Sequence, residues 1–425
     1  MRLFKQNTNK EKKSIKKKFY SLLKKTKSLW KKNIIKNKTK FTFKESLIFM
    51  LITFFLGMLI GGIIMYGKTN YRGSGKDALN EFVSTYNDIL NNYYQEVDGK
   101  ELLESGIEGM INYLGDPYAA YMDTDETEEF SETVEGEYCG IGAEIIFTYA
   151  DSITKIGNVF ENSPAMKAGL QEGDIIVGVN GESIEGKTSA DIASLVKGKK
   201  GTEVTIKILR SDEELEFTIT RDTVDIPSVT SEVYEENEKK IGYLLVDIFA
   251  NNTDEQFEKE LKELEKENID SLIIDVRGNS GGYLTTVTNI ISLFTEKGSS
   301  IYQLKTKGEI EIIKDKTNDV RKYPIAVLVD SRSASASEVL SAALKENYGA
   351  TIIGTNTFGK GKVQKSYKLS NGSLIKYTYQ EWLTPNGNSI DGVGIEPNIM
   401  IQYKYEKDAK IDNQLKEAIK EISQK

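Results

Sequence analysis

The sequence contains no histidine among its 425 residues. A chain without imidazole lacks the commonest general base and the usual ligand of zinc sites. It also contains a single cysteine, Cys139, which excludes an intramolecular disulfide and, without histidine, a Cys/His catalytic pair. Any catalysis by this chain must therefore rely on hydroxyls, carboxylates or lysine amines.

Acidic residues are scarce in only one part of the chain. Residues 1–45 carry 17 lysines and arginines against two acids, Glu11 and Glu45, while the whole chain has a formal charge of −8. The remaining residues therefore balance to −23. A basic arm on an acidic body indicates a local task for the arm, so we expect no nucleic-acid partner.

One long stretch lacks charge altogether. Residues 46–67, "SLIFMLITFFLGMLIGGIIMYG", are long enough to cross a bilayer as a helix. A buried core helix or a cleaved signal peptide are the alternatives, but the run is long for a signal peptide and no small-x-small cleavage site follows it. By the positive-inside rule, we expect a single-pass cell-membrane protein with residues 1–45 in the cytoplasm and residues 68–425 outside.

The extracytoplasmic part reads as a multidomain α/β chain. Residues 68–136 combine two predicted helices with an acidic connector, "DTDETEEFSETVEGE", which we interpret as a solvated face. Residues 137–221 have the short strands and turns of a β-rich domain, and residues 222–405 alternate apolar strands with helical patterns, which predicts a partly parallel sheet. An amphipathic helix is expected within residues 406–425.

A serine-rich segment, "SRSASASEVLSAAL", offers candidate nucleophiles just before a predicted helix over 336–348. Ser335 and Glu338 have capping-box spacing, which places Ser335 at the helix mouth, where free amides and the helix dipole favour an oxyanion. The competing hydroxyls are those of Ser331, Ser333, Ser337 and Ser341, of which Ser333 is the second choice.

A neighbouring base must then accept the serine proton, and without histidine the candidates are carboxylates and a neutral lysine. Lys360 in "TFGKGKVQ" has flanking glycines that allow close backbone approach, and Phe358 could help to exclude water. Burial would lower the pKa of its amine toward neutrality. Lys362 shares a strand face with it and is the rival base, and Gln364 lies on the same side as Lys360.

The Gly-rich segment "RGNSGG" (277–282) follows a predicted strand and could supply backbone amides to an oxyanion. The amide of Ala336 is the natural first donor. Gly281 is our prediction for the second, with Gly278 and Gly282 left open.

Two resemblances to known families accompany these motifs. Residues 137–221 resemble the PDZ domains fused to bacterial proteases, in "YCGIGAEI", "SPAMKAGLQEGDIIVGVNG" and "LVKGKKGTEVTIKILR". The resemblance implies a loop that binds a peptide's terminal carboxylate, here Gly140, Ile141, Gly142 and Ala143, with an apolar substrate C-terminus as ligand.

The chain from "GIEGMINYLGDPYAAYM" to "TPNGNSIDGVGIEPNI" resembles the carboxy-terminal processing proteases, tail-specific serine peptidases with a Ser-Lys dyad. The blocks "DVRGNSGG", "SRSASASEVLSAAL" and "TFGKGKVQ" occur in the family's order. The resemblance implies Ser335 as nucleophile, Lys360 as base and Gln364 as its orienting amide, with no metal or organic cofactor. Ser280 and Lys197 depart from the residues found in some relatives.

We therefore interpret the chain as a membrane-anchored endopeptidase that cuts protein substrates near their C-termini and uses its PDZ-like domain for recognition and gating. The helices within 69–125 and the C-terminal helix are candidates for homodimer contacts. The alternative is a catalytically inactive PDZ-type membrane tether.

Overall fold

The computed structural model describes residues 53, 75–148, 153–318, 320–407 and 410–425. The chain separates into two compact units, one up to Leu103 and one from Glu104 onward. The predicted basic arm (1–45) and, apart from Thr53, the predicted transmembrane helix (46–67) lie outside the described residues. Within the described part, no helix combines the length and apolar character needed to cross a membrane.

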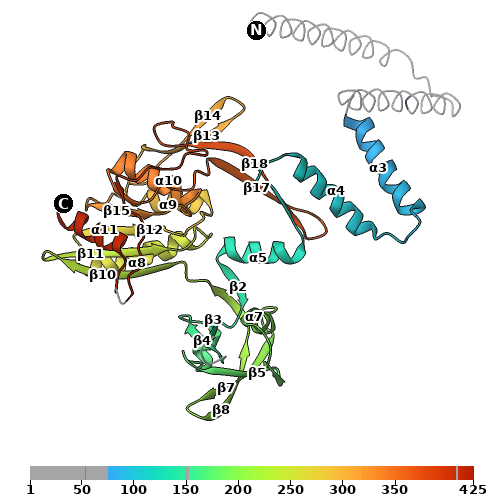
Figure 1. Ribbon diagram of the computed structural model, residues 1–425, viewed down its shortest axis with the longest axis horizontal. Helices are drawn as coiled ribbons and strands as arrows, with labels where there is room; N and C mark the ends of the chain where they lie inside the picture. Colours follow the sequence, from blue (N-terminus) through green and yellow to red (C-terminus); the bar gives the residue numbers. More distant parts are fainter. Residues whose placement is uncertain (1–52, 54–74, 149–152, 319, 408–409) are drawn as a thin grey trace, which may run out of the picture. The chain divides into compact units, whose positions relative to one another are not determined.

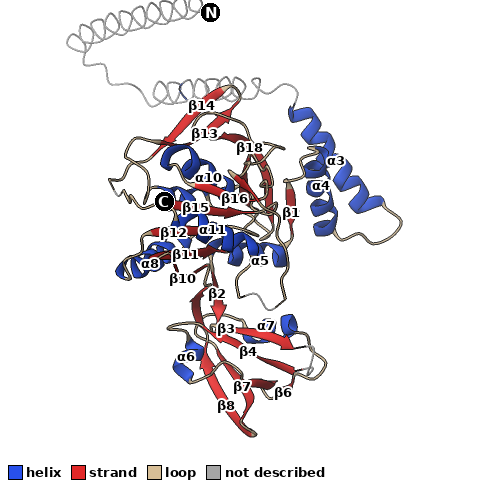
Figure 2. Cartoon of the chain, turned by 60° about the vertical axis from the view of Figure 1, so that its left-hand side comes forward, coloured by secondary structure: helices blue, strands red, loops and turns tan. Residues whose placement is uncertain are grey.

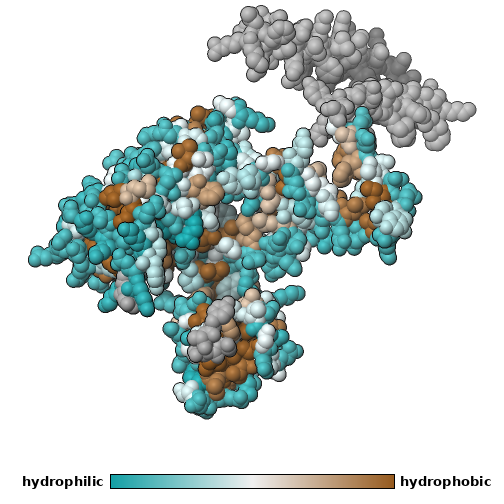
Figure 3. All heavy atoms as spheres, viewed as in Figure 1, coloured by the Kyte–Doolittle hydropathy of each residue, from teal (hydrophilic) through white to brown (hydrophobic). Residues whose placement is uncertain are grey.

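The described part of the first unit is helical. α3 spans Gly75–Asn92, and α4, Gly99–Tyr113, begins in this unit and continues past its end. The Tyr86 hydroxyl donates to the carbonyl of Gly99 at 2.9 Å and ties the two helices together. No residue of α3 is buried. Its exposed apolar side chains are Leu79, Phe82, Val83, Ile89 and Leu90. Hydrophobic side chains are visible on the surface of the helical part (Figure 3).

The acidic segment after α4 is a helix, so its interpretation as a solvated connector is incomplete. α5 (Thr124–Glu135) starts at the N-cap Asp123, whose carboxylate accepts two first-turn amides, and ends at Gly136 in a left-handed conformation. Phe130 and Val134 lie four residues apart on one face of the helix and line a cavity. The acidic side chains lie on a helix at the surface, as expected, but the apolar face of this helix forms part of a cavity wall.

The β-rich domain is a small antiparallel sheet with two helices. Its strand order is β3-β4-β5-β7-β8, with β6 paired to β5. A closed core forms from the apolar side chains of both helices and the strands, with Ile156, Ile192 and Ile206 fully buried. The elements are β3 (Ala143–Thr148), β4 (Ile153–Val159), α6 (Pro164–Ala168), β5 (Ile175–Val179), β6 (Glu182–Ser183), α7 (Ser189–Val196), β7 (Glu203–Arg210) and β8 (Glu213–Thr220).

Two short strands lead into and out of this domain. β2 (Glu137–Gly140) and β9 (Asp222–Asp225) pair in antiparallel fashion, and Asn252 holds the two strands together at one end of the ribbon. Its Nδ2 donates to the carbonyl oxygen of Gly136 at 3.0 Å and to Oδ1 of Asp225 at 3.1 Å. The β-rich domain is therefore an insertion on a two-stranded stem.

The following domain is a three-layer α/β fold (Figures 1 and 2). Its sheet has the order β10-β11-β12-β15-β16-β19, and every neighbouring pair is parallel except β10 with β11. The elements are β10 (Val229–Glu236), β11 (Lys239–Val246), α8 (Thr253–Lys266), β12 (Ser271–Asp275), α9 (Leu284–Ile291), β15 (Ile325–Val329), α10 (Ala336–Ala343), β16 (Thr351–Gly354), β19 (Ile399–Met400) and α11 (Asn413–Ser423).

Alternation along the buried strands determines which helices cover which face. Leu272 and Ile274 pack with side chains of α8, α9 and α10, whereas Ile273 packs with the apolar side of α11. A strand exposes successive side chains to opposite faces, so a continuous apolar run is expected where both faces are covered. The predicted helix over 336–348 consists of α10 followed by one π-helical turn, η1 (Leu344–Tyr348), which ends at Gly349.

A second sheet of five antiparallel strands joins distant parts of the chain. Its order is β1-β18-β13-β14, with β17 paired along β18. β1 precedes α5 and pairs with the start of β18, so the segment 116–122 lies beside a hairpin formed more than 240 residues later. The elements are β1 (Ala120–Met122), β13 (Ser300–Thr306), β14 (Glu309–Lys314), β17 (Lys362–Lys368) and β18 (Leu374–Leu383).

Candidate active site

The serine-rich loop follows the carboxyl end of β15, on the side of the sheet where open α/β folds bind ligands. Ser335 is the N-cap of α10 and has φ of 53° and ψ of −111°. A residue with a side chain rarely adopts positive φ, so the fold holds this serine in a strained conformation. Such strain is typical of residues at functional sites.

The hydroxyls of three competing serines are engaged elsewhere, and the fourth, Ser331, is exposed and lines a different cavity from Ser335. Ser333 is fully buried and donates to the carbonyl of Val276 at 2.7 Å, while Ser337 and Ser341 donate to backbone carbonyls at 2.9 and 2.7 Å. Among the described residues, the Ser335 hydroxyl donates to no acceptor, and with Glu338 it belongs to the capping box of α10. Of these five serines, Ser335 alone lines the cavity described below.

A cavity of about 520 Å³ contains Ser335, Lys360 and Gln364. Its walls are α5, the Gly-rich loop after β12 and one face of the β17–β18 hairpin. The structure thus brings together three predicted residues: Ser335 at the start of α10, Lys360 in the loop before β17 and Gln364 on β17. No hydrogen bond joins Ser335 to Lys360 within the described residues.

The two candidate lysines have opposite environments. Lys362 forms a salt bridge with Asp391 at 2.9 Å, and this bond raises its pKa. The pKa of Lys360 is lowered, chiefly by burial and then by the like charge of Lys376, although Asp116 raises it. A base needs its amine neutral, which favours Lys360 over Lys362.

Lys360 is shielded by residues other than Phe358. That side chain is 54% exposed and does not line the cavity, so its predicted role in excluding water is wrong. The backbone near Lys360 instead packs on the buried ring of Trp382, whose Nε1 donates to the Lys360 carbonyl at 2.8 Å. The close approach predicted for the flanking glycines is present, since a Cβ on Gly361 would lie 2.7 Å from the side chain of Asp391.

Gln364 connects the lysine amine to the segment before β1. The Lys360 Nζ donates to Gln364 Oε1 at 2.9 Å, and Gln364 Nε2 donates to the carbonyl of Tyr118. The two bonds fix which amide atom faces the amine. The Tyr118 ring also lies 5.0 Å from Lys360 Nζ. Nothing local in "LGDPY" indicates this contact, because Tyr118 and Gln364 lie 246 positions apart.

Glu338 has a larger role than the capping residue that its spacing indicates. It is fully buried, and its carboxylate accepts the amide of Ser335 at 2.9 Å, as a capping box would. The same carboxylate accepts the amides of Gly359 at 2.7 Å and Lys360 at 2.8 Å and the hydroxyl of Thr357 at 2.6 Å. One side chain therefore fixes the distance between the serine loop and the lysine loop.

The Gly-rich loop lies against the serine. A Cβ on Gly281 would be 2.8 Å from that of Ser335, and the φ of 111° at Gly281 disfavours a side chain there. The Gly281 amide donates to Asn279 Oδ1 at 2.8 Å, and Asn279 Nδ2 donates to the carbonyl of Val246 at 2.8 Å. The amide of Ala336, in contrast, has no acceptor among the described residues.

Arg277 anchors this loop to the end of the chain. Its guanidinium contacts Asp275 at 2.5 Å and donates to Asp412 and Gln414 at 2.9 Å each. Asp412 is the N-cap of α11. Hydrogen bonds to these carboxylates raise the pKa of Arg277 against the opposing effect of burial.

The predicted carboxylate-binding loop joins β2 to β3. Gly140 and Ile141 are buried, and Gly142 has φ of 77° with Ser163 so close that a Cβ there would clash. Hydrogen bonds from the amides of Gly142 and Ala143 partly offset the rise that burial causes in the pKa of Tyr138. These amides therefore face a hydroxyl of the chain itself.

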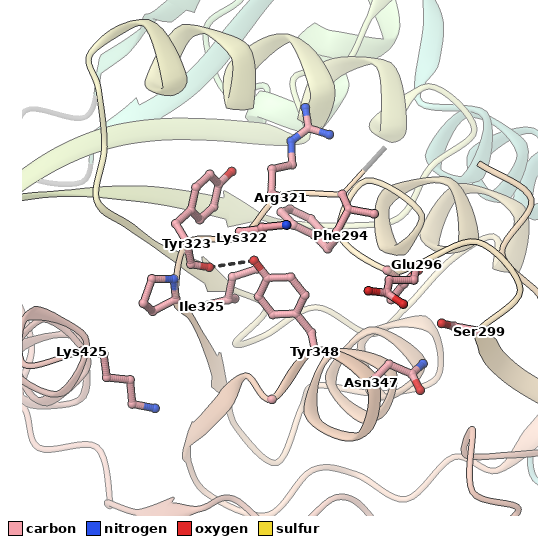
Figure 4. Close-up of a pocket in the computed structure, with 14 residues that line it drawn as sticks. Phe294, Glu296, Ser299, Arg321, Lys322, Tyr323, Ile325, Asn347, Tyr348 and Lys425 are labelled. Carbon is pink, nitrogen blue, oxygen red and sulfur yellow. Dashed lines mark hydrogen bonds between the residues drawn. The ribbon is translucent and has the colours of Figure 1, made fainter. Parts of the chain in front are cut away.

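A second cavity, of about 380 Å³, contains none of the predicted site residues (Figure 4). It lies at the amino ends of β15 and β16, where Tyr348 donates to the carbonyl of Tyr323 at 2.7 Å. Ligands of open α/β sheets bind at the opposite, carboxyl ends of the strands. We therefore assign the chemistry to the cavity with Ser335.

Family models match three stretches of the chain. The model of peptidase family S41 matches residues 240–401, a PDZ domain model matches 155–210, and a model of the activating protease CtpB N-terminal domain matches 63–127. Among solved structures, a photosystem II D1 C-terminal processing protease is 26% identical, with 74% of this chain and 85% of that one covered and a TM-score of 0.45.

Two curated relatives are similar over most of their length. Carboxy-terminal processing protease CtpB of Bacillus subtilis (strain 168) is 39% identical over 328 residues, which cover 76% of this chain and 68% of that protein. A probable CtpA-like serine protease of Staphylococcus epidermidis (strain ATCC 12228) is 35% identical over 357 residues, 83% of this chain and 71% of the relative. This chain therefore belongs to the carboxy-terminal processing proteases, serine peptidases of family S41 with a PDZ domain.

Proposed function

We propose that this protein is a membrane-anchored serine endopeptidase that cleaves protein substrates near their C-termini with Ser335 and Lys360 as a catalytic dyad. One observation carries the proposal: a strained serine, whose hydroxyl donates to no acceptor among the described residues, and a lysine with a lowered pKa line one cavity. Ser335 attacks the scissile carbonyl while the neutral Lys360 amine accepts the hydroxyl proton. The resulting ammonium then protonates the leaving amine.

Gln364 acts as a positioning residue in this scheme. One N–H of the Lys360 amine donates to the amide oxygen of Gln364, so the amine's lone pair is free to face the serine. Water attacks the acyl-enzyme in the second half, again with Lys360 accepting a proton. The carboxylate product leaves and Ser335 regains its hydrogen.

The oxyanion is held by backbone amides. Ala336 supplies one donor at the start of α10, supported by its unengaged amide and by the helix dipole. Gly281 supplies the second once its amide exchanges the Asn279 oxygen for the oxyanion.

The remaining parts of the chain bind substrates, anchor the protein and contact a second copy. The PDZ-like domain binds an apolar C-terminus along Gly140, Ile141, Gly142 and Ala143 and gates access to the dyad. Residues 46–67 anchor the protein as a single span, with the peptidase outside the cytoplasm. Exposed apolar side chains on α3 support dimer contacts through the N-terminal helices.

The test compares the full-length protein in detergent micelles with three variants, using an unstructured protein substrate that ends in apolar residues. Intact mass is followed over time. We expect Ser335→Ala to abolish cleavage and Lys360→Ala to slow it at least about 10²-fold, because a positioned base contributes that much. Lys362→Ala, which removes the rival lysine two residues away, should cleave the same bonds.

Cleavage by Ser335→Ala would refute the nucleophile and bring forward Ser333. Loss of cleavage in Lys362→Ala with retention in Lys360→Ala would reverse the assignment of the base. If the unaltered protein binds the apolar C-terminus but never cuts it, the chain acts as a tether rather than as a peptidase.

A further inference from the structure

The cavity that contains Ser335 has an unbalanced charge. Its lining includes three lysines, Lys360, Lys362 and Lys376, and no aspartate or glutamate. Lys362 is paired with Asp391, and Lys360 donates to an amide oxygen. Lys376 has neither kind of partner among the residues that the structure describes.

Strand pairing directs Lys376 into the cavity. It lies on β18 opposite Ser366 of β17, and two positions further along the ladder Thr378 lies opposite Gln364. Residues two apart on a strand share a face, so Lys376 and Ser366 lie on the same face as Gln364. All three of Gln364, Ser366 and Lys376 line the cavity.

The ammonium of Lys376 is held against an aromatic ring. Its Nζ lies 5.0 Å from the ring centroid of Phe130 in α5, which also lines the cavity. A ring face attracts a cation but does not replace a hydrogen-bond acceptor. Burial lowers the pKa of Lys376, and no neighbouring carboxylate offsets this effect.

A half-buried ammonium without an anionic partner costs free energy, and a bound carboxylate would remove that cost. Apolar side chains also line the cavity, among them Val134, Ile248, Leu284 and Trp382. A peptide suited to this cavity therefore has apolar residues and one negative charge. The charge can be an Asp or Glu side chain or the terminal carboxylate itself, since their chemistry is the same.

We propose that Lys376 is a specificity-determining residue that binds a carboxylate of the substrate peptide inside the catalytic cavity. The proposal rests on the peptidase function proposed above and adds a substrate class to it: apolar peptides with one carboxylate near the scissile bond. It is separate from recognition of a C-terminus by the PDZ-like domain.

The test uses the full-length protein and sets of apolar peptides that differ only in one Gln→Glu exchange at successive positions, each made with a free or an amidated C-terminus. The measured quantity is the ratio of kcat/KM for the charged and the neutral peptide. We expect a preference of about tenfold or more at one position, since a hydrogen bond to a charged group contributes that much. The position, or the free C-terminus, identifies which carboxylate is bound.

Three variants separate specificity from other effects. Lys376→Met should bring the ratio to about one, and Lys376→Glu should favour a peptide with lysine at the same position. Lys365→Met is the matched control, because it removes one exposed positive charge from the opposite face of the same hairpin. A loss of rate that is equal for all peptides reflects the influence of Lys376 on Lys360 and cancels in the ratio.

A charged-to-neutral ratio that is the same in the unaltered protein and in Lys376→Met overturns the proposal. The affinities of the charged and neutral peptides can also be compared by equilibrium binding, with and without Lys376→Met in a Ser335→Ala protein that does not cleave them. This measurement tests the carboxylate site independently of catalysis. Absence of cleavage with a Lys376-dependent binding preference would refute the peptidase but support the carboxylate site. Cleavage without such a preference would support the peptidase and refute the carboxylate site.

Discussion

Lys360 works in the proposed mechanism as a neutral amine, so its environment sets the pH dependence of cleavage. Burial and the like charge of Lys376 lower its pKa, while Asp116 and Glu338 raise it. The Tyr118 ring and Gln364 complete its surroundings without an opposing charge. Because the deprotonated form is active, kcat/KM should rise with pH through a limb below the ordinary lysine pKa of about 10.4.

Two substitutions should move this limb in opposite directions. Lys376→Met removes the like charge, which raises the pKa of Lys360 and shifts the limb to higher pH. Asp116→Asn removes an opposite charge and shifts it to lower pH. The profile is measured with a neutral peptide between about pH 6 and pH 10, and Lys376→Arg should restore the original limb. An unmoved limb in both variants would show that another group controls the rate.

Glu338 is predicted to support catalysis through the two loops that it joins. Glu338→Gln keeps the size of the side chain but replaces one acceptor oxygen with a donor facing backbone amides. We expect the free energy of unfolding to fall by about 1–3 kcal/mol, the cost of unsatisfied buried groups. Cleavage should slow by about 10²-fold, because a small misplacement of reacting groups has that effect.

The matched control for Glu338 is Glu346→Gln in η1. Its carboxylate accepts one amide, that of Asn386 at 2.8 Å, and a glutamine oxygen can accept the same bond. Thermal unfolding and kcat are measured for both variants. Equal behaviour of the two would contradict the linking role of Glu338.

At the scale of elements, the end of α5 depends on one glycine. Gly136 has φ of 74°, and a Cβ there would lie 2.2 Å from Asn252 Oδ1 and 2.8 Å from Ala250 Cβ. Gly186 has a similar φ of 75° but open space around it. A left-handed conformation costs an alanine about 1 kcal/mol at either position. Any further loss of unfolding free energy in Gly136→Ala therefore measures the clash with Asn252.

We expect Gly136→Ala to lower the unfolding midpoint in urea clearly more than Gly186→Ala does. It should also weaken cleavage, since α5 carries Phe130 and Val134 into the cavity. Equal midpoints for the two variants would show that the stem of the β-rich domain adapts to the added methyl group.

Local patterns predicted elements well where they reflect burial on both faces or helical spacing. The apolar runs of β12 and β15 and the helical run after Ser335 are examples, and capping-box spacing placed that serine at the start of α10. The same reasoning missed the apolar face of α5, because the many acidic residues around Phe130 and Val134 indicated a solvated segment. It could not separate Lys360 from Lys362, since their pKa values depend on Asp391 and Lys376, which come from elsewhere in the chain.

Contacts over long sequence distances were out of reach for a physical reason. The bonds of Glu338 to Lys360 and of Gln364 to Tyr118 depend on how strands pair across two sheets. Strand order is not encoded in the periodicity of any one segment. Resemblance to a family supplied Lys360 and Gln364, but not Glu338, Tyr118 or Lys376.

At the scale of the whole molecule, the proposed membrane topology can be tested by labelling the single cysteine. Cys139 is partly exposed and lies on β2, in the part expected outside the cytoplasm. A membrane-impermeant thiol reagent should label it in intact cells, and Cys139→Ser should remove the label. Labelling that appears only after the membrane is opened would place this domain in the cytoplasm.

The anchoring of Arg277 by the start of α11 makes the loop beside Ser335 depend on a helix from a distant part of the chain. Asp412 and Gln414 lie 135 and 137 positions after the arginine that begins the Gly-rich loop. During synthesis, that arginine gains these two partners only once α11 has left the ribosome. The apolar side of α11 is buried against the sheet, so the same helix couples the stability of the sheet to the order of the loop.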